Sequence, residues 1–568
     1  MSARSILIDC GSGVRLERGV PSRMRDGVIL YSDHYYPTGT GPSPTLLMRQ
    51  PYGRDIASTV VYAHPVWFAR AGYHVVIQDV RGRGGSEGEF YPFRNEGFDG
   101  FDTLAWLCQH PACNGCIGMY GFSYQGFTQL LAAVEDPPGL KAIAPGMTAH
   151  DLFEGWFYHH GALRLASTLG WGIQMLKEDA RRGKLKEASD NLENAWTNVR
   201  AQSLRVPYGK HSVISAPGLP TYVSDWFAHD SPGSYWQSLD ISTRLDRIQL
   251  PALHVIGWYD TYLKGSFDCF KLLTKQGTAN QYLVAGPWVH IPWGDAAGEG
   301  ALGKSALLNT DGLLLRWFNH WLKGTEEFSG EPVVRHFALG SNCWHATSTL
   351  EAEISISFYL RSQGNANSRK GDGVLTIDAP IDGEPRDIFV YDPEVPVLAP
   401  GGITAAPGAF DQAGLELGNN ILVYSTAPLE QNLHLFGCPS VTLHATSSAE
   451  STDFTAKLVR VKTDGQCEFI CIGIARSTWL FRHSGFQSDK IIMWEFELEP
   501  TSCLFAKGEQ IRLEIGSSAF PLYDRNPGVL KDPAQCDSWD WRRSTQMILH
   551  ELGHQSMITL PLARPALN

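Results

Sequence analysis

The hexapeptide Gly121-Phe122-Ser123-Tyr124-Gln125-Gly126 carries the clearest chemical signal in this sequence. It follows a short apolar run at 117–120 and precedes a segment rich in alanine and leucine at 128–134. A serine between a buried strand and a helix, flanked by small residues, is typical of a nucleophile elbow, in which the backbone turns sharply and exposes the hydroxyl. The pattern therefore indicates covalent acyl transfer through Ser123.

A serine nucleophile needs a general base that accepts its proton near neutral pH, and this base is usually histidine. Among 19 histidines, His290 is best placed, because it lies just past an apolar run that ends at Val284. Asp260 closes the preceding strand-like run and could orient that histidine. The order Ser123, Asp260, His290 is that of α/β-hydrolases, in which each residue lies at the carboxyl end of a strand. We therefore expect these three residues to form a catalytic triad.

Three stretches of different character must position these residues. Residues 1–145 and 241–345 contain continuous apolar runs, at 45–48, 73–78, 117–120, 252–256 and 281–284, and such runs are typical of buried parallel strands. The stretch between them reads as helical, including the charged amphipathic segment 179–201. After residue 345 the pattern changes to short alternating strands, as at 354–360 and 440–445, separated by glycine and proline.

This pattern predicts an α/β protein with three domains. A discontinuous catalytic domain would comprise 1–145 and 241–345, a helical cap 146–240, and an all-β sandwich 346–568.

The composition of the chain excludes several classes of binding partner and cellular location. With 568 residues the chain is too long for one hydrophobic core, and its net charge of −12 argues against binding to nucleic acid or to anionic membranes. No apolar run approaches the roughly 20 residues that span a bilayer, and the N-terminus does not read as a signal peptide. Eleven cysteines, an odd number, favour reduced thiols and a cytoplasmic location. The sequence leaves open whether the chain forms a homo-oligomer.

Several motifs together resemble one known family. The chain is similar to the CocE/NonD hydrolases, the cocaine esterase family, which is related to X-prolyl dipeptidyl peptidases and α-amino acid ester hydrolases. The displaced second glycine of the elbow, with Gln125 at its usual place and Gly126 one residue further on, is itself a mark of this family. The other segments that carry the resemblance are Pro51-Tyr52-Gly53-Arg54 and residues 78–88, 257–260, 286–290, 453–459 and 520–526.

The resemblance implies an α/β-hydrolase core with an inserted helical cap and a C-terminal jelly roll. It also implies an oxyanion hole formed by the Tyr52 hydroxyl and the backbone N–H of Tyr124. Aromatic residues stand where this family holds an aromatic acyl group, at Trp156, Trp171 and Tyr262. The resemblance thus implies a serine carboxylesterase that needs no cofactor and acts on a small-molecule ester with a bulky apolar or aromatic acyl group.

Other functions use similar machinery and stay open at this point. An acylase, amidase or acyltransferase would form the same acyl-enzyme, and a binding protein would leave the triad idle. X-prolyl dipeptidyl peptidase and amino-acid ester hydrolase activities are disfavoured, because Thr261, Tyr262 and Leu263 put no carboxylate after Asp260 to pair with a substrate ammonium group.

Two motifs suggest metals but fit them poorly. His550-Glu551-Leu552-Gly553-His554 matches the H-E-x-x-H pattern of zinc proteases, yet it lies between strand-like segments and contains a glycine that weakens a helix, so we expect a turn. Cys113-Asn114-Gly115-Cys116 has no second cysteine pair nearby. We therefore expect no metal site.

Overall fold

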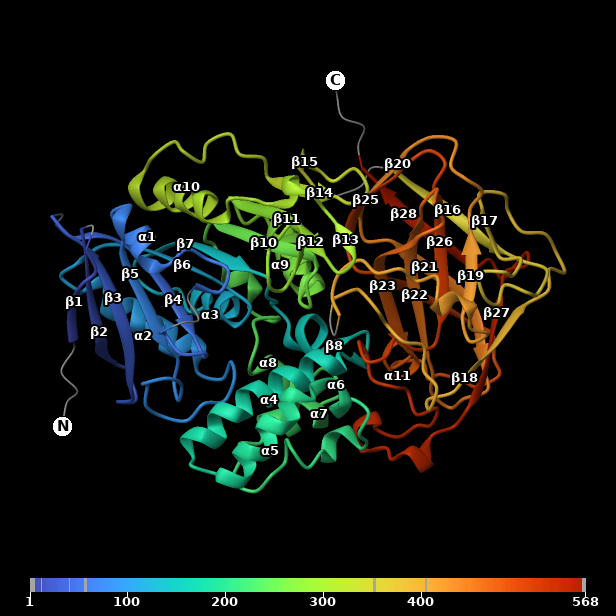
Figure 1. Cartoon of the computed structure of the whole chain (residues 1–568), viewed down its shortest axis with the longest axis horizontal. Coiled ribbons are helices and arrows are strands. Elements are labelled where there is room, and N and C mark those ends of the chain that lie inside the picture. The colour runs from blue at the N-terminus through green and yellow to red at the C-terminus, as the bar shows by residue number, and fades with distance from the viewer. Residues whose placement is uncertain are drawn as a thin grey trace.

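The chain is described here by a computed structural model that covers residues 6–11, 13–39, 41–55, 59–350, 354–403 and 406–563. Figure 1 shows a mixed α/β part in blue to yellow-green, a group of helices in teal below it, and a β-rich part in orange and red beside both. The expected fold class is confirmed, with an α/β-hydrolase core, an inserted helical cap and a C-terminal β domain.

A mixed sheet of eleven strands in the described residues forms the core of the first part. Its central strands run parallel, whereas β1–β3 and β15 add antiparallel edges. The five apolar runs that predicted buried strands coincide with β4, β5, β6, β10 and β11 of this sheet, although β5 begins at His74, one residue after the start of its run. In sheet order the strands are β1 (Ile6–Asp9), β2 (Val14–Arg23), β3 (Ile29–Pro37), β5 (His74–Asp79), β4 (Ser43–Gln50), β6 (Cys113–Phe122), β7 (Leu140–Gly146), β10 (Ala252–Tyr259), β11 (Gln281–Val289), β14 (Val334–Ala338) and β15 (Cys343–Thr347).

Helices cover both faces of this sheet. Apolar side chains of α1 (Pro65–Arg70) and α10 (Thr310–Lys323) pack in one core cluster, and those of α2 (Glu96–Cys108) and α3 (Tyr124–Ala133) pack in another. The buried side chains of α9 (Leu263–Lys275) are divided between this second cluster and the core that extends into the β domain. This two-sided cover explains why β5 and β10 are buried along their whole length.

The cap lies between β7 and β10 in the sequence. It begins with a π-helical turn (Phe153–Phe157) and the short hairpin β8 (Tyr158–His159) and β9 (Ala162–Leu163). The predicted helical segment 179–201 is not continuous, because Gly183 and Lys184, the latter with φ of 55°, end the first helix. The cap helices are α4 (Leu165–Arg182), α5 (Lys186–Thr197), α6 (Val199–Gln202), α7 (Tyr222–Ala228) and α8 (Ser234–Gln237).

The C-terminal part is a mainly antiparallel β domain whose strands form one extended network with a buried apolar interior. The predicted alternating segments 354–360 and 440–445 lie in β16 and β21. The domain limits at 145, 240 and 345 stay predictions. The elements are β16 (Ile354–Arg361), β17 (Val374–Thr376), β18 (Asp387–Tyr391), β19 (Leu422–Ser425), β20 (Leu433–Gly437), β21 (Ser440–Ser447), β22 (Asp453–Val461), β23 (Cys467–Arg476), α11 (Ser477–Leu480), β24 (Ile492–Glu497), β25 (Thr501–Phe505), β26 (Gln510–Gly516), β27 (Ser544–Leu549) and β28 (Met557–Leu562).

Buried ion pairs join the three parts. Arg83, in the turn after β5, is fully buried and pairs with Asp179 of α4 at 3.0 Å. Arg164 of the cap pairs with Glu499 of the β domain at 3.2 Å.

Among the described residues, none of the helices combines the length and apolar character that crossing a bilayer requires.

Candidate active site

Ser123 lies between β6 and α3 in a strained backbone conformation. Its φ of 59° and ψ of −130° are rare for a residue with a side chain, and such strain is held only where the surroundings enforce it. Here the Ser123 N–H donates to the carbonyls of Gly146 (2.9 Å) and Met147 (3.1 Å). The serine is therefore fixed at a sharp strand-to-helix turn, as the elbow pattern predicts.

The two glycines of the hexapeptide have distinct steric roles. A Cβ at Gly121 would lie 2.5 Å from the Cβ of Gln125, and a Cβ at Gly126 would lie 2.8 Å from the carbonyl oxygen of Gly146. Gly121 thus leaves room for the buried Gln125, while Gly126 lets α3 pack directly on β7. The second glycine is displaced because the close approach between helix and strand occurs at residue 126.

Asp260 and His290 follow the neighbouring parallel strands β10 and β11. The Nδ1 atom of His290 is hydrogen-bonded to Oδ2 of Asp260, whose side chain is fully buried. The other carboxylate oxygen of Asp260 accepts the N–H of Tyr262 at 2.7 Å. A proton held on Nδ1 leaves the Nε2 lone pair of His290 available as a base. The pair is therefore arranged as the acid and base of a triad.

The two expected oxyanion donors lie near the serine but differ in kind. Tyr124 is the first residue of α3, so its backbone N–H has no acceptor within the helix, and its phenol is turned away to donate to Glu96 at 2.9 Å. The Tyr52 hydroxyl accepts the indole N–H of Trp171 at 3.3 Å. Burial raises the pKa of Tyr52 to about 12, although hydrogen bonds with Trp171 and Ser123 lower it. This phenol therefore stays protonated at neutral pH and can act as a hydrogen-bond donor.

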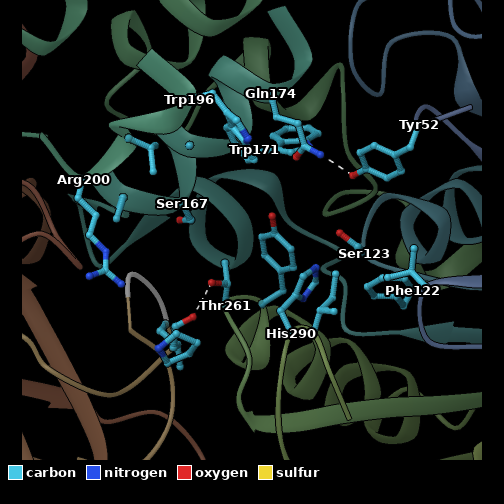
Figure 2. A pocket seen from close by; sticks show the side chains of 18 of the residues that line it. Tyr52, Phe122, Ser123, Ser167, Trp171, Gln174, Trp196, Arg200, Thr261 and His290 are labelled. Atoms are coloured by element: carbon cyan, nitrogen blue, oxygen red, sulfur yellow. Dashed lines mark hydrogen bonds between the residues drawn. The ribbon is translucent and has the colours of Figure 1, made fainter. Parts of the chain in front are cut away.

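A cavity of about 680 Å³ opens between the core, the cap and a loop of the β domain. Figure 2 shows Ser123, His290 and Tyr52 on one side of it, and Trp171, Gln174 and Trp196 on the other. Tyr262 also lines the cavity and packs edge-on against the His290 ring, with ring centroids 5.3 Å apart. The lining is mostly apolar and aromatic, as in sites that bind small organic ligands.

Trp156 does not line the cavity, although it was predicted to be a substrate-binding residue. It is 2% exposed and is not among the side chains that line the cavity. Its ring is stacked on Tyr262, with centroids 3.9 Å apart and planes at 24°, so Tyr262 stands between the indole and the cavity. Trp156 therefore supports the wall rather than forming its surface.

Several other residues that line the cavity are not indicated by the sequence. Trp196, Val199 and Arg200 come from α5 and α6, and Ile403 and Pro407 come from an irregular loop of the β domain. The amphipathic pattern of 179–201 indicates a helix but not which of its side chains face a cavity. No local signal marks the loop residues, because only the domain packing brings them to the site.

The two metal-like motifs do not form metal sites in the described residues. His550 is buried and hydrogen-bonded to Asp387 at 3.1 Å, whereas His554, after the predicted turn, is 36% exposed. Cys113 and Cys116 are free thiols. Across the described residues, no group of three or more His, Cys, Asp or Glu side chains is arranged to hold a metal ion.

Known proteins resemble this chain along most of its length. Residues 26–292 match the family described as X-Pro dipeptidyl-peptidase (S15 family), and residues 326–559 match the X-Pro dipeptidyl-peptidase C-terminal non-catalytic domain. The cocaine esterase of Rhodococcus sp. (strain MB1 Bresler) is 33% identical over 566 residues, which cover 95% of this chain and 97% of that protein.

Solved structures share the whole architecture. An α-amino acid ester hydrolase is 23% identical with a TM-score of 0.81, and the match covers 98% of both chains. A CocE/NonD family hydrolase of Staphylococcus aureus is 17% identical with a TM-score of 0.71, covering 99% of this chain and 97% of that one.

The fold, the strained serine and the aspartate–histidine pair together define a serine hydrolase built on an α/β-hydrolase core. The chain belongs to the CocE/NonD family, within the wider S15 family, and it is a serine ester hydrolase.

Proposed function

We propose that this protein is a carboxylesterase that hydrolyses small-molecule esters with a bulky apolar or aromatic acyl group, through an acyl-enzyme formed on Ser123. The observation that carries this proposal is the cavity of about 680 Å³, whose lining includes Ser123 and His290 together with the aromatic side chains of Trp171 and Tyr262. A cavity of this size accommodates an aromatic acyl group together with the ester linkage.

In the proposed acylation step, the Ser123 Oγ atom attacks the ester carbonyl carbon while His290 Nε2 accepts the hydroxyl proton. Buried Asp260 stabilises the imidazolium that forms. The carbonyl oxygen becomes an oxyanion that accepts hydrogen bonds from the Tyr124 N–H and the Tyr52 hydroxyl, each worth on the order of 3 kcal/mol.

Collapse of the tetrahedral intermediate breaks the bond to the alcohol oxygen, which takes the proton from His290 and leaves. Water then attacks the acyl-enzyme, gives its proton to His290, and releases the carboxylic acid as the proton returns to Ser123. An ester is favoured over an amide because an alkoxide leaves with less help than an amine needs.

The charge of the cavity argues against substrates with a free amino group. No Asp or Glu is among the described residues that line it, and Arg200 adds a positive charge. An ammonium group buried there would stay unpaired, which is costly. This supports an esterase over an X-prolyl dipeptidyl peptidase or an amino-acid ester hydrolase, although relatives with such names share the fold.

A series of 4-nitrophenyl esters tests the acyl preference, because the leaving group stays constant while the acyl group varies. We expect kcat/KM for the benzoyl ester to exceed that for the acetyl ester by about tenfold or more, since each buried CH₂-sized group contributes about 0.8 kcal/mol. The alanyl ester, with its ammonium group, should be the poorest of the three. Preference for the alanyl ester would contradict the proposal.

The fate of the acyl group separates hydrolysis from acyl transfer. With an added alcohol such as methanol, an esterase gives mainly the carboxylic acid, whereas an acyltransferase gives mainly the new ester. We expect the acid to dominate at millimolar alcohol.

A cytoplasmic location is part of the same proposal, supported by eleven cysteines that are all free thiols.

A further inference from the structure

Tyr52 sits on a short segment between β4 and the next part of the core, without a helix or strand of its own to hold it. An oxyanion donor must be aimed in advance, and a misplacement of about 1 Å can cost up to a hundredfold in rate. The residues that fix this segment are therefore relevant to the rate of the reaction.

Hydrogen bonds link the buried carboxylate of Asp79 to the chain on both sides of Tyr52. Asp79 ends β5, directly opposite Gln50 at the end of β4. The Gln50 side chain donates to Asp79 Oδ1 at 3.3 Å and accepts the Tyr52 N–H at 2.8 Å. Beyond Tyr52, the Arg54 N–H donates to the same Oδ1 atom at 2.7 Å.

The carboxylate itself is held in place from several directions. Its second oxygen, Oδ2, accepts the Gly85 N–H at 3.0 Å and pairs with the Arg54 guanidinium, which also binds Asp33 at 2.8 Å. A Cβ at Gly84 would lie 2.0 Å from Oδ2, so glycine at this position lets the turn after β5 close around the carboxylate. The side chains of Gln50 and Asp79 are fully buried.

We propose that Asp79 is a positioning residue for the esterase reaction, holding the Tyr52 hydroxyl at the oxyanion site by fixing the backbone on both sides of Tyr52. The inference rests on the proposed role of Tyr52 as an oxyanion donor. Asp79 is not among the described residues that line the cavity, so it acts only through Tyr52. Gln50 is the relay on one side, and the Arg54 N–H is the direct link on the other.

A double-mutant cycle with Tyr52→Phe tests this role, with Asp79→Asn as the second change. In the Tyr52 background, Asp79→Asn should lower kcat about tenfold with KM changed less than threefold, because the loss falls on the transition state. In the Tyr52→Phe background, the same change should lower kcat by less than twofold. Equal losses in the two backgrounds would show that Asp79 acts independently of Tyr52 and would overturn the inference.

Two further variants keep the test decisive. Gln50→Ala removes only the relay and leaves the Arg54–Asp79 pair, so it should lower kcat about threefold, again only when Tyr52 is present. This variant decides the question if Asp79→Asn does not fold. Asp99→Asn is the matched control, because Asp99 is also buried and paired with an arginine, Arg81, but does not contact the Tyr52 segment.

The same set separates the inference from the proposed function. If Tyr52→Phe alone leaves kcat unchanged, the oxyanion role of Tyr52 is wrong. If Tyr52→Phe lowers kcat but Asp79→Asn and Gln50→Ala do not, the oxyanion role stands and the positioning role of Asp79 is wrong.

Discussion

The two walls of the cavity are built in different ways. On the core wall, Ser123 and His290 line the cavity, and Asp260 is buried behind His290. Each of the three follows a strand of one sheet, and backbone geometry fixes where they meet. On the cap wall, Trp171 and Trp196 come from helices, and side-chain packing fixes them. Trp171, for example, is stacked on Trp226 with centroids 5.1 Å apart and planes at 5°.

This difference separates reactivity from selectivity. Strand ends in a parallel sheet give a fixed frame on which a nucleophile, a base and an acid can be held with little freedom. Packed aromatic rings on a cap define the shape of the pocket and can change without moving the triad. We therefore expect substitutions in the core wall to lower kcat for every ester, and substitutions in the cap wall to change the ranking of acyl groups.

The largest effect should come from Asp260→Asn. The neutral amide no longer stabilises the imidazolium or fixes the histidine tautomer, and in a comparable triad this change lowers kcat about 10⁴-fold. The loss should be the same for benzoyl and acetyl esters, which steady-state kinetics on both will measure. A loss confined to the benzoyl ester would contradict the assignment of Asp260 to the chemical step.

The next largest effect should be a loss of stability on breaking the Arg83–Asp179 ion pair between the core and the cap. Arg83→Met removes the buried guanidinium that pairs with Asp179 and lies over the Phe90 ring at 3.8 Å. Breaking a buried pair typically costs about 3–5 kcal/mol, so the free energy of unfolding should fall by several kcal/mol in a denaturant titration.

Arg181→Met is the control for Arg83→Met. Arg181 is 68% exposed and pairs with Glu178 on the same helix, so its loss should change stability by less than about 1 kcal/mol. Similar stability losses in the two variants would show that the Arg83 pair does not hold the cap to the core.

Tyr52→Phe should lower kcat about 100-fold with KM nearly unchanged, since one hydrogen bond to the oxyanion is lost. Tyr124→Phe is the matched control. It removes a phenol that bonds Glu96 but keeps the backbone N–H, so it should lower stability while leaving kcat within about threefold. Equal losses of kcat in the two variants would mean that the Tyr52 hydroxyl is not a specific oxyanion donor.

The smallest effect should come from Trp196→Ala on the cap wall. Trp196 lines the cavity and is 39% exposed, so its removal should cost about 1 kcal/mol of acyl-group contact. We expect kcat/KM for the benzoyl ester to fall about fivefold, with the acetyl ester unchanged. Trp539→Ala, at a 74% exposed tryptophan of the β domain, should change neither value. Equal losses for both esters would contradict a selectivity role.

The contrast between the walls also explains what could be predicted from the sequence. The strands and the residues that end them were predictable, because a buried parallel strand is a continuous apolar run and a polar residue directly after it stands out. Asp260 and His290 were found in this way, although the sequence alone does not reveal that they share a hydrogen bond.

The cap wall could be predicted only in part. Trp171 lines the cavity, and its role in substrate binding stays a prediction. Trp156 is covered by Tyr262, because an aromatic residue in a sequence does not show which of two stacked rings faces a cavity. Trp196 and Arg200 line the cavity from helices that follow the break at Gly183, which the sequence pattern of 179–201 does not indicate. Such details depend on tertiary packing.

Labelling with a fluorophosphonate tests most directly whether Ser123 forms the acyl-enzyme. The reagent should modify one residue, Ser123, as located by peptide mass spectrometry, and abolish turnover of 4-nitrophenyl benzoate in proportion to labelling. Ser123→Ala should be both unlabelled and inactive. Labelling of another residue, or retained turnover by folded Ser123→Ala, would show that Ser123 is not the nucleophile.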